Sequence, residues 1–293
     1  MKNTNNPKLN NSGGFTLIEL SIVLVIIGLI VSGVLVGQYL VKAAEVRATI
    51  AQYEKYNASM NAFRTRFNAL PGDLTFAEAN SFGINPAAGS LTVGGNGNGL
   101  VESTSSSNLN APVSEPLLIW QQLTAANLID GSYGTAITTA AQMAASPTPD
   151  LYFPSAKTGR GGVWLAGSSG GLNYYVIANV TGVTTGGAGT ATYATAVGGA
   201  ITPVEAFNID SKIDDGLPNT GIVQARGHAT MSTTADTLFA ALGGSSQPTW
   251  TNTTGASGDC VIGTSATATN DTYNRSTATG GDTPACSLRM RFN

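Results

Sequence analysis

The most pronounced feature of the chain is a long apolar run close to its N-terminus. Residues 1–14 are polar and carry Lys2 and Lys8, whereas residues 20–41 hold no charged side chain and consist mostly of Val, Ile and Leu, up to Lys42. A helix needs about 20 apolar residues to cross a bilayer. The run therefore predicts a transmembrane helix, and the two leader lysines place its N-terminus in the cytoplasm.

Beyond Lys42 the apolar positions repeat with helical spacing. Residues three and four apart share one face of a helix, and such a stripe predicts an amphipathic helix over 42–70 that packs its apolar face into a head domain. Pro71 and Gly72 are expected to end this helix. From residue 15 to residue 67 it would be about 80 Å long. The stripe consists of Val46, Ile50, Tyr53, Tyr56, Met60, Phe63 and Phe67.

Residues 71–293 predict an α+β head. Ser114 and Pro116 are typical of a helix start, with Gly131 as the expected end, and Thr202-Pro203-Val204-Glu205 is a capping box that begins a second helix. The strict alternation of residues 286–292 predicts the last strand of an antiparallel sheet, with an exposed arginine face. The stretch 181–200 is rich in Gly, Thr and Ala, and two alternatives are open for it, a strand or a mobile loop. Further strands are expected at 151–153, 162–166, 172–180 and 191–197.

The composition narrows the class of protein. With 293 residues, of which 42% are hydrophobic, the chain can bury a substantial core. Only 11% of the residues are charged, against about 25% in an average globular protein, which fits an extracellular β-rich domain better than a cytosolic enzyme. The 14 basic and 17 acidic residues give no basic footprint for nucleic acid. His228 is the single histidine, so a multi-histidine metal site is impossible, and the acidic residues are too scattered to place a pair in one cleft, so we expect no enzyme.

Glu19 is the one acidic residue at the start of the apolar run. An ordinary secretory signal peptide is cut after its apolar stretch, whereas here the small residues Gly13 and Gly14 precede it. Cleavage after Gly14 would leave the helix on the mature protein and place a new amine on Phe15. A carboxylate in lipid costs a few kcal/mol and needs a partner. The Phe15 amine of a neighbouring copy would neutralise Glu19 and fix the register between subunits.

The segment Gly14-Phe15-Thr16-Leu17-Ile18-Glu19-Leu20 resembles the cleavage and methylation motif of type IV prepilins and type II secretion pseudopilins. The resemblance implies a pilin-like fold, in which a long N-terminal helix packs against an antiparallel sheet. It also implies that an inner-membrane prepilin peptidase cuts after Gly14 and methylates Phe15, and that Glu19 acts in assembly. The competing interpretation is a plain signal anchor in which Glu19 is incidental.

This resemblance implies a division of the chain into a cleaved leader (1–14), a transmembrane and assembly helix (15–41), an amphipathic helix (42–70) and a periplasmic or extracellular head (71–293). The subunit would be stored in the inner membrane, engage an assembly platform there and polymerise into a filament, as a pilin, a minor pilin or a pseudopilin. Many type IV pilins carry a proline in mid-span, where this chain has Gly28, Gly33 and Gly37. Whether the helix melts there on assembly is left open.

A membrane-anchored monomeric binding module is the alternative from another functional class. Trp164, Trp250 and the polar loops of the head could serve adhesion to a surface or a glycan. Such tryptophans are more often core residues.

The two cysteines, Cys260 and Cys286, lie late in the chain and 26 positions apart. In an oxidising compartment they are expected to form a disulfide that contributes about 3 kcal/mol. The resemblance implies the same, because pilins commonly close a C-terminal loop in this way. The alternative is a pair of free, buried thiols.

Three aspartates cluster in sequence after the predicted capping-box helix. Asp210 and Asp214 share a helix face if the helix continues that far, and Asp214 and Asp215 sit near its C-terminal end, where the helix dipole disfavours negative charge. Three forms of compensation are open: a Ca²⁺ ion, Lys212 or an arginine from elsewhere, or a solvated turn at Asp215-Gly216. No other cofactor is expected.

Overall fold

The computed structural model divides the chain into two compact units, Met1–Ala44 and Glu45–Asn293. Helix α1 (Leu17–Phe67) contributes residues to both of them. The described residues are 14, 16–84, 94–101, 115–133, 149–179, 182–186, 190–194, 199–227, 260–262, 271–276 and 281–292.

The described part of the first unit is the apolar stretch of α1. This helix is long and apolar enough to cross a membrane, and its large apolar side chains are exposed. The hydroxyls of Ser21 and Ser32 are satisfied within the helix, since Ser21 donates to the Ile18 carbonyl and Ser32 to the Leu29 carbonyl, both at 2.9 Å. This local pairing suits an environment that offers no water. The helix is continuous through Gly28, Gly33 and Gly37.

In the second unit, α1 buries the aromatic stripe that its spacing predicts. Tyr56 lies with its ring centroid 5.0 Å from that of Trp120 and 5.4 Å from that of Trp164, both in edge-on geometry. The Tyr53 hydroxyl donates to the Arg291 carbonyl at 2.8 Å. Edge-on aromatic pairs add to the stability gained from burial alone, so this stripe fixes the helix on the sheet. The predicted amphipathic character is confirmed.

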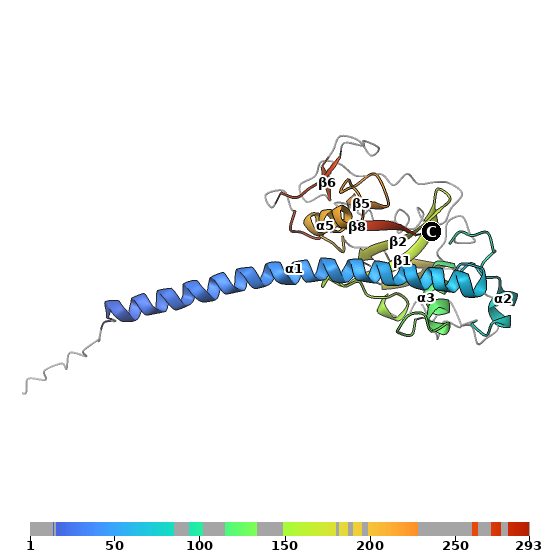
Figure 1. Cartoon of the computed structure of the whole chain (residues 1–293), viewed down its shortest axis with the longest axis horizontal. Helices are drawn as coiled ribbons and strands as arrows, with labels where there is room; N and C mark the ends of the chain where they lie inside the picture. The colour runs from blue at the N-terminus through green and yellow to red at the C-terminus, as the bar shows by residue number, and fades with distance from the viewer. Residues whose placement is uncertain are drawn as a thin grey trace, which may run out of the picture. The chain divides into compact units, whose positions relative to one another are not determined.

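A four-stranded antiparallel sheet forms the centre of the head, as Figure 1 shows. Its strand order is β1-β2-β8-β5, so the last strand of the chain lies inside the sheet. The predicted α+β class is confirmed. The strands are β1 (Gly162–Ser169), β2 (Leu172–Asn179), β5 (Val223–Gly227) and β8 (Cys286–Phe292).

The alternation along β8 is confirmed, although its arginine face is half-buried rather than exposed. The reason is that β8 is flanked by β2 and β5. Arg289 donates from Nε to the Gln224 Oε1 atom at 2.7 Å, and its guanidinium lies 4.6 Å from the ring centroid of Tyr174. Neighbouring strands therefore cover part of a face that the sequence assigns to solvent.

Two short hairpins complete the described strands. β3 (Gly182–Gly186) pairs with β4 (Thr190–Ala194). Of the two alternatives for the stretch 181–200, strand and mobile loop, these residues form strands. The rest of the predicted strand, residues 195–197, lies outside the described residues. β6 (Val261–Ile262) pairs with β7 (Thr272–Tyr273).

Two predictions on helix ends need correction. Helix α3 (Glu115–Ala125) stops before Gly131, because Asn127 adopts a left-handed φ of 57° and Leu128 donates back to the Leu123 carbonyl at 2.9 Å. A left-handed residue followed by such a bond is the motif that commonly closes a helix C-terminus. Helix α1 likewise ends before Pro71, since Asn68 adopts a φ of 53°. Asparagine tolerates this conformation better than most residues.

The predicted strand at 151–153 is wrong. The chain forms a 3₁₀ helix, η1 (Pro149–Leu151), and the backbone amides of Tyr152 and Phe153 both donate to the Pro149 carbonyl, at 2.9 and 3.0 Å. Tyr152 and Phe153 are buried in the core. The apolar side chains at these positions are therefore explained by burial of a turn, and they do not indicate a strand.

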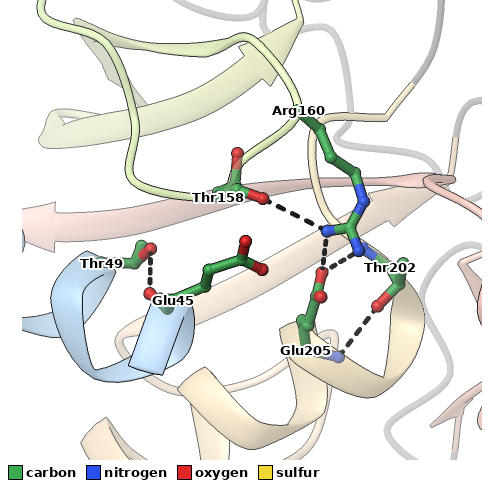
Figure 2. Close-up of polar contacts among 6 residues, drawn as sticks. All are labelled: Glu45, Thr49, Thr158, Arg160, Thr202 and Glu205. Atoms are coloured by element: carbon green, nitrogen blue, oxygen red, sulfur yellow. Dashed lines mark hydrogen bonds and ion pairs between the residues drawn. The ribbon is translucent and has the colours of Figure 1, made fainter. Parts of the chain in front are cut away.

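Helix α5 (Pro203–Ile213) begins with the predicted capping box, in which Thr202 and Glu205 satisfy each other's backbone amides. Figure 2 shows that Glu205 also binds Arg160, whose Nη1 atom lies 2.6 Å from Glu205 Oε2. The same Nη1 donates to the Thr158 carbonyl at 3.4 Å. The buried Glu205 side chain thus ties the segment before β1 to the start of α5. The short helix α2 (Phe76–Ser81) has a capping box as well.

Candidate processing and assembly site

The proposed cleavage point lies immediately before helix α1. Gly14 is exposed, and Thr16 is the residue that precedes the first helical residue, Leu17. Phe15 lies outside the described residues, so the structure gives no geometry for its amine. A protease requires an accessible backbone, and Gly14 meets this requirement.

Thr16 and Glu19 form a capping box at the start of α1. The Thr16 amide and the Thr16 hydroxyl both donate to Glu19 Oε2 at 2.8 Å, and the Glu19 amide donates to Thr16 Oγ1 at 3.3 Å. Sequence reasoning missed this role of Glu19. The signal was available, because Thr-x-x-Glu is the same pattern that correctly predicts the start of α5.

The capping box leaves Glu19 able to accept a further partner. Its Oε1 atom accepts no hydrogen bond from any residue in the described part of the chain, and the side chain is exposed. A carboxylate can accept about four hydrogen bonds in total. Glu19 can therefore cap its own helix through one oxygen and bind an amine through the other.

The three aspartates of the predicted cluster come together in the head. One carboxylate oxygen of each of Asp210, Asp214 and Asp215 lies within 4.8 Å of the other two. Asp210 is buried and accepts hydrogen bonds from the Tyr273 hydroxyl at 2.7 Å and the Gly216 amide at 3.2 Å. Burial raises the pKa of Asp210 to about 7, and the neighbouring aspartates add to the rise. Burial also raises the pKa of Tyr273.

Backbone amides and a hydroxyl compensate the other two aspartates. Asp214 Oδ2 accepts from the amides of Ile222 and Val223, and Asp215 accepts from the Leu217 amide at 2.8 Å and the Thr220 hydroxyl at 2.6 Å. No ion pair joins Asp214 or Asp215 to Lys212 or to an arginine within the described ranges. Within the described residues, the expected compensation by Lys212 or an arginine is therefore not found, whereas the bond from the Leu217 amide to the exposed Asp215 agrees with the expected turn at Asp215-Gly216.

The three clustered carboxylates still fit a hard cation as ligands. Ca²⁺ takes carboxylate and carbonyl oxygens, and each carboxylate here keeps acceptor capacity beyond the bonds described. Calcium binding by Asp210, Asp214 and Asp215 remains a prediction.

The predicted disulfide is present. Cys260 and Cys286 are bonded, with their Cα atoms 4.9 Å apart. Cys286 begins β8, one of the two inner strands of the sheet, and Cys260 precedes β6. The bond therefore closes the C-terminal loop onto the central sheet, and the alternative of two free thiols is wrong.

The residues considered for adhesion or catalysis gain no support. Trp164 is fully buried, and its indole donates to Gln52 Oε1 at 3.2 Å, so it is a core residue. Trp250 and His228 lie outside the described residues.

Comparison with known proteins agrees with the N-terminal geometry. Residues 9–35 match the family described as the prokaryotic N-terminal methylation motif. Neither the search of curated proteins nor the search of solved structures found a match. The matched residues include Gly14, Thr16 and Glu19 and most of the apolar helix. This chain therefore carries the prepilin-type signal that marks type IV pilin and pseudopilin precursors.

Proposed function

We propose that the chain is a filament-forming subunit, either a type IV pilin or a pseudopilin. Prepilin peptidase cleaves it between Gly14 and Phe15 and methylates the Phe15 amine. Residues 15–41 hold the subunit in the inner membrane until the assembly platform extracts it. The head, residues 71–293, then faces the periplasm or the cell surface as part of the filament.

The observation that carries this proposal is the methylation motif, in which Glu19 stands directly before the uncharged apolar run of residues 20–41. A simple anchor gains only a helix cap from Glu19, and an acidic residue at this depth costs insertion free energy. A polymer gains a specific contact, because the Phe15 amine of one subunit and Glu19 of the next neutralise each other. Breaking such a pair leaves an uncompensated buried charge, which selects the correct register.

The capping box gives Glu19 a second role, and the test must separate the two. Glu19→Gln keeps an oxygen that can accept from Thr16 but removes the charge. Thr16→Val keeps the charge but removes the cap. If the charge pairs with a neighbour's amine, Glu19→Gln abolishes filaments although the protein accumulates in the membrane. Thr16→Val should then reduce filament yield only mildly.

The matched control is Thr16→Ser, which preserves both the cap and the charge and should assemble like the wild type. Filaments are sheared from cells and identified by mass spectrometry, and the membrane pool is measured by immunoblot. Filament yield that is unchanged in Glu19→Gln would contradict a charge-dependent assembly role.

The rival function, a monomeric membrane-anchored binding module, predicts a different result. An anchored binder works as a single copy, so Glu19→Gln should leave its surface binding intact, and the wild type should yield no filaments. The absence of filaments in cells that assemble other pilins, together with intact anchoring, would favour the rival.

A further inference from the structure

Two reactive Asn-Gly pairs follow one another in the loop at residues 96–99. Asn96 and Asn98 are both exposed, and each stands between two glycines, so both lie in the same tripeptide, Gly-Asn-Gly. Asparagine is chemically labile, and it is most labile before glycine, which has no side chain to shield its backbone nitrogen. No other asparagine in the chain precedes a glycine.

Loss of the side-chain amide of asparagine, called deamidation, begins at the nitrogen of the following glycine. That nitrogen loses its proton and attacks the side-chain carbonyl carbon of the asparagine. A carbon–nitrogen bond closes a succinimide ring, and the side-chain nitrogen leaves as ammonia. Water then opens the ring at either carbonyl and leaves aspartate or isoaspartate. A group that holds the proton on the glycine nitrogen therefore slows the reaction.

Asp73 holds the glycine nitrogens of both pairs, but in different ways. The Gly99 amide, which would attack Asn98, donates to the Oδ2 atom of Asp73 at 2.8 Å. The Gly97 amide, which would attack Asn96, donates to the backbone carbonyl of Asp73 at 3.0 Å. A hydrogen bond to a charged acceptor is about twice as strong as one to a neutral acceptor, and a nearby negative charge opposes loss of a proton. The two pairs therefore differ in protection, although their sequences are the same.

The backbone of the loop explains why the reactive residues are needed. Gly97 and Gly99 adopt left-handed φ values of 73° and 82°, which a side chain at either position would disfavour. Asn96 Oδ1 accepts from the Asn98 amide at 3.0 Å, and Asn98 Oδ1 accepts from the Leu100 amide at 2.8 Å. Such turns are typical of asparagine. The same residues that shape the loop therefore form its reactive pairs.

We propose that Asn96 and Asn98 are sites of spontaneous deamidation, and that the buried carboxylate of Asp73 selectively slows the reaction at Asn98. The inference is independent of the proposed function, because it concerns bonds within the head alone. Water is the one co-reactant, and both asparagines are exposed to it.

Isoaspartate at position 98 would weaken the attachment of the loop to Asp73. The amides of Asn98 and Gly99 bind the two oxygens of that one carboxylate, at 3.1 and 2.8 Å. Isoaspartate adds a carbon atom to the backbone between these two amides, so the two bonds cannot both keep their geometry. The reaction is therefore a one-way change in the loop, and the Asp73 carboxylate delays it.

The first test compares the two sites within one molecule. The purified protein is incubated at mildly alkaline pH, folded or unfolded in guanidinium chloride, and peptide mapping by mass spectrometry measures deamidation at each asparagine. In the unfolded chain, Asn96 and Asn98 should react at about the same rate, because their neighbours are the same. In the folded protein, Asn98 should react about tenfold more slowly than Asn96, the difference expected between a charged and a neutral acceptor. Equal rates in the folded protein would contradict the proposal.

Removal of the carboxylate should act on one site only. Asp73→Ala should raise the rate at Asn98 by about 10- to 100-fold, the effect of losing a hydrogen bond to a charged group. The rate at Asn96 should stay close to its wild-type value, because the backbone carbonyl of Asp73 remains. Asp73→Asn keeps an acceptor oxygen without the charge, so it should give a smaller rise at Asn98, and it provides the same test if Asp73→Ala does not fold.

Glu115→Gln is the matched control. Glu115 is a second buried carboxylate at this loop, and its Oε1 atom accepts from the Asn96 amide at 3.0 Å. That amide attacks neither asparagine, so the rates at both sites should stay near those of the wild type. Equal acceleration of both sites in the Asp73 variants would show that these variants only loosen the loop. An unchanged rate at Asn98 would show that the carboxylate gives no protection, and either result would overturn the inference.

Discussion

The Tyr273 hydroxyl donates a hydrogen bond of 2.7 Å to the buried carboxyl group of Asp210, across 63 positions of sequence. Asp210 belongs to α5, and Tyr273 belongs to β7, within the segment that the Cys260–Cys286 disulfide encloses. This bond therefore joins the acidic cluster to the C-terminal loop. Asn219 adds a second link, since its Nδ2 atom donates to Asp271 at 2.9 Å.

We expect Asp210 to make stability depend on pH. Burial raises its pKa to about 7 in the folded chain, against about 3.9 in an unfolded one. The folded state therefore retains the proton more strongly, so this contribution to stability is complete below about pH 4 and is lost as pH rises to about 7. Asp210→Asn should remove this loss and raise the free energy of unfolding above pH 7 by about 2–4 kcal/mol.

The measurement is urea unfolding of the purified protein, with EDTA present, from pH 4 to pH 8. Asp282→Asn makes the same change of charge at an exposed position and serves as the control. A wild-type profile that does not differ from that of Asp210→Asn would contradict the assignment.

Calcium should stabilise the head through the three clustered aspartates. Saturating Ca²⁺, at about 100 times its dissociation constant, contributes about 2.7 kcal/mol. That corresponds to a rise in melting temperature of about 5–10 °C for a domain of this size. Asp215→Asn should abolish most of the rise. Melting temperatures measured in Ca²⁺ and then in EDTA decide the matter, and equal values in the wild type end the calcium prediction.

Reduction of the disulfide should weaken the C-terminal loop and β8 together. Loss of the Cys260–Cys286 bond is expected to lower the free energy of unfolding by about 3 kcal/mol. The double variant Cys260→Ser/Cys286→Ser should show the same loss and no further response to reductant. If reductant changes the unfolding midpoint of the wild type and of the double variant equally, the effect does not come from this bond.

The ion pair between Arg160 and Glu205 should tolerate loss of both charges better than loss of one. Glu205 is buried, so Arg160→Met leaves an unpaired buried carboxylate, at a cost of about 3 kcal/mol. Adding Glu205→Gln keeps the capping contact to Thr202 and removes that charge, so the double variant should recover much of the loss. Thermal unfolding of the wild type, the two single variants and the double variant measures the interaction between the two side chains. Additive effects of the two changes would show that the side chains do not interact.

The sequence predicted those features that depend on local pattern. Helical spacing in residues 46–67 predicted the buried face of α1, and the Thr202–Glu205 capping box predicted the start of α5. The predictions were wrong where the backbone conformation of one or two residues decides where a helix ends or which local structure forms. Asn127 turns left-handed and ends α3 early, and Phe153 lies in a helical turn where a strand was expected.

Features that depend on distant neighbours could not be predicted. The alternation in β8 indicates a strand but not its place between β2 and β5, which decides how far Arg289 is covered. The same limit applies to the cluster of aspartates. Their spacing was visible, but the hydrogen bond from Tyr273 and the amides of Ile222 and Val223 come from other segments of the chain.

The central claim is that the mature subunit begins with a new amine that binds Glu19 of a neighbour. The most direct test is the N-terminal residue of the protein purified from cells with an active prepilin peptidase, determined by intact mass and N-terminal peptide sequencing. The account predicts a chain that starts at Phe15 and carries one N-methyl group. A chain that still starts at Met1, in cells that process other prepilins, would contradict it.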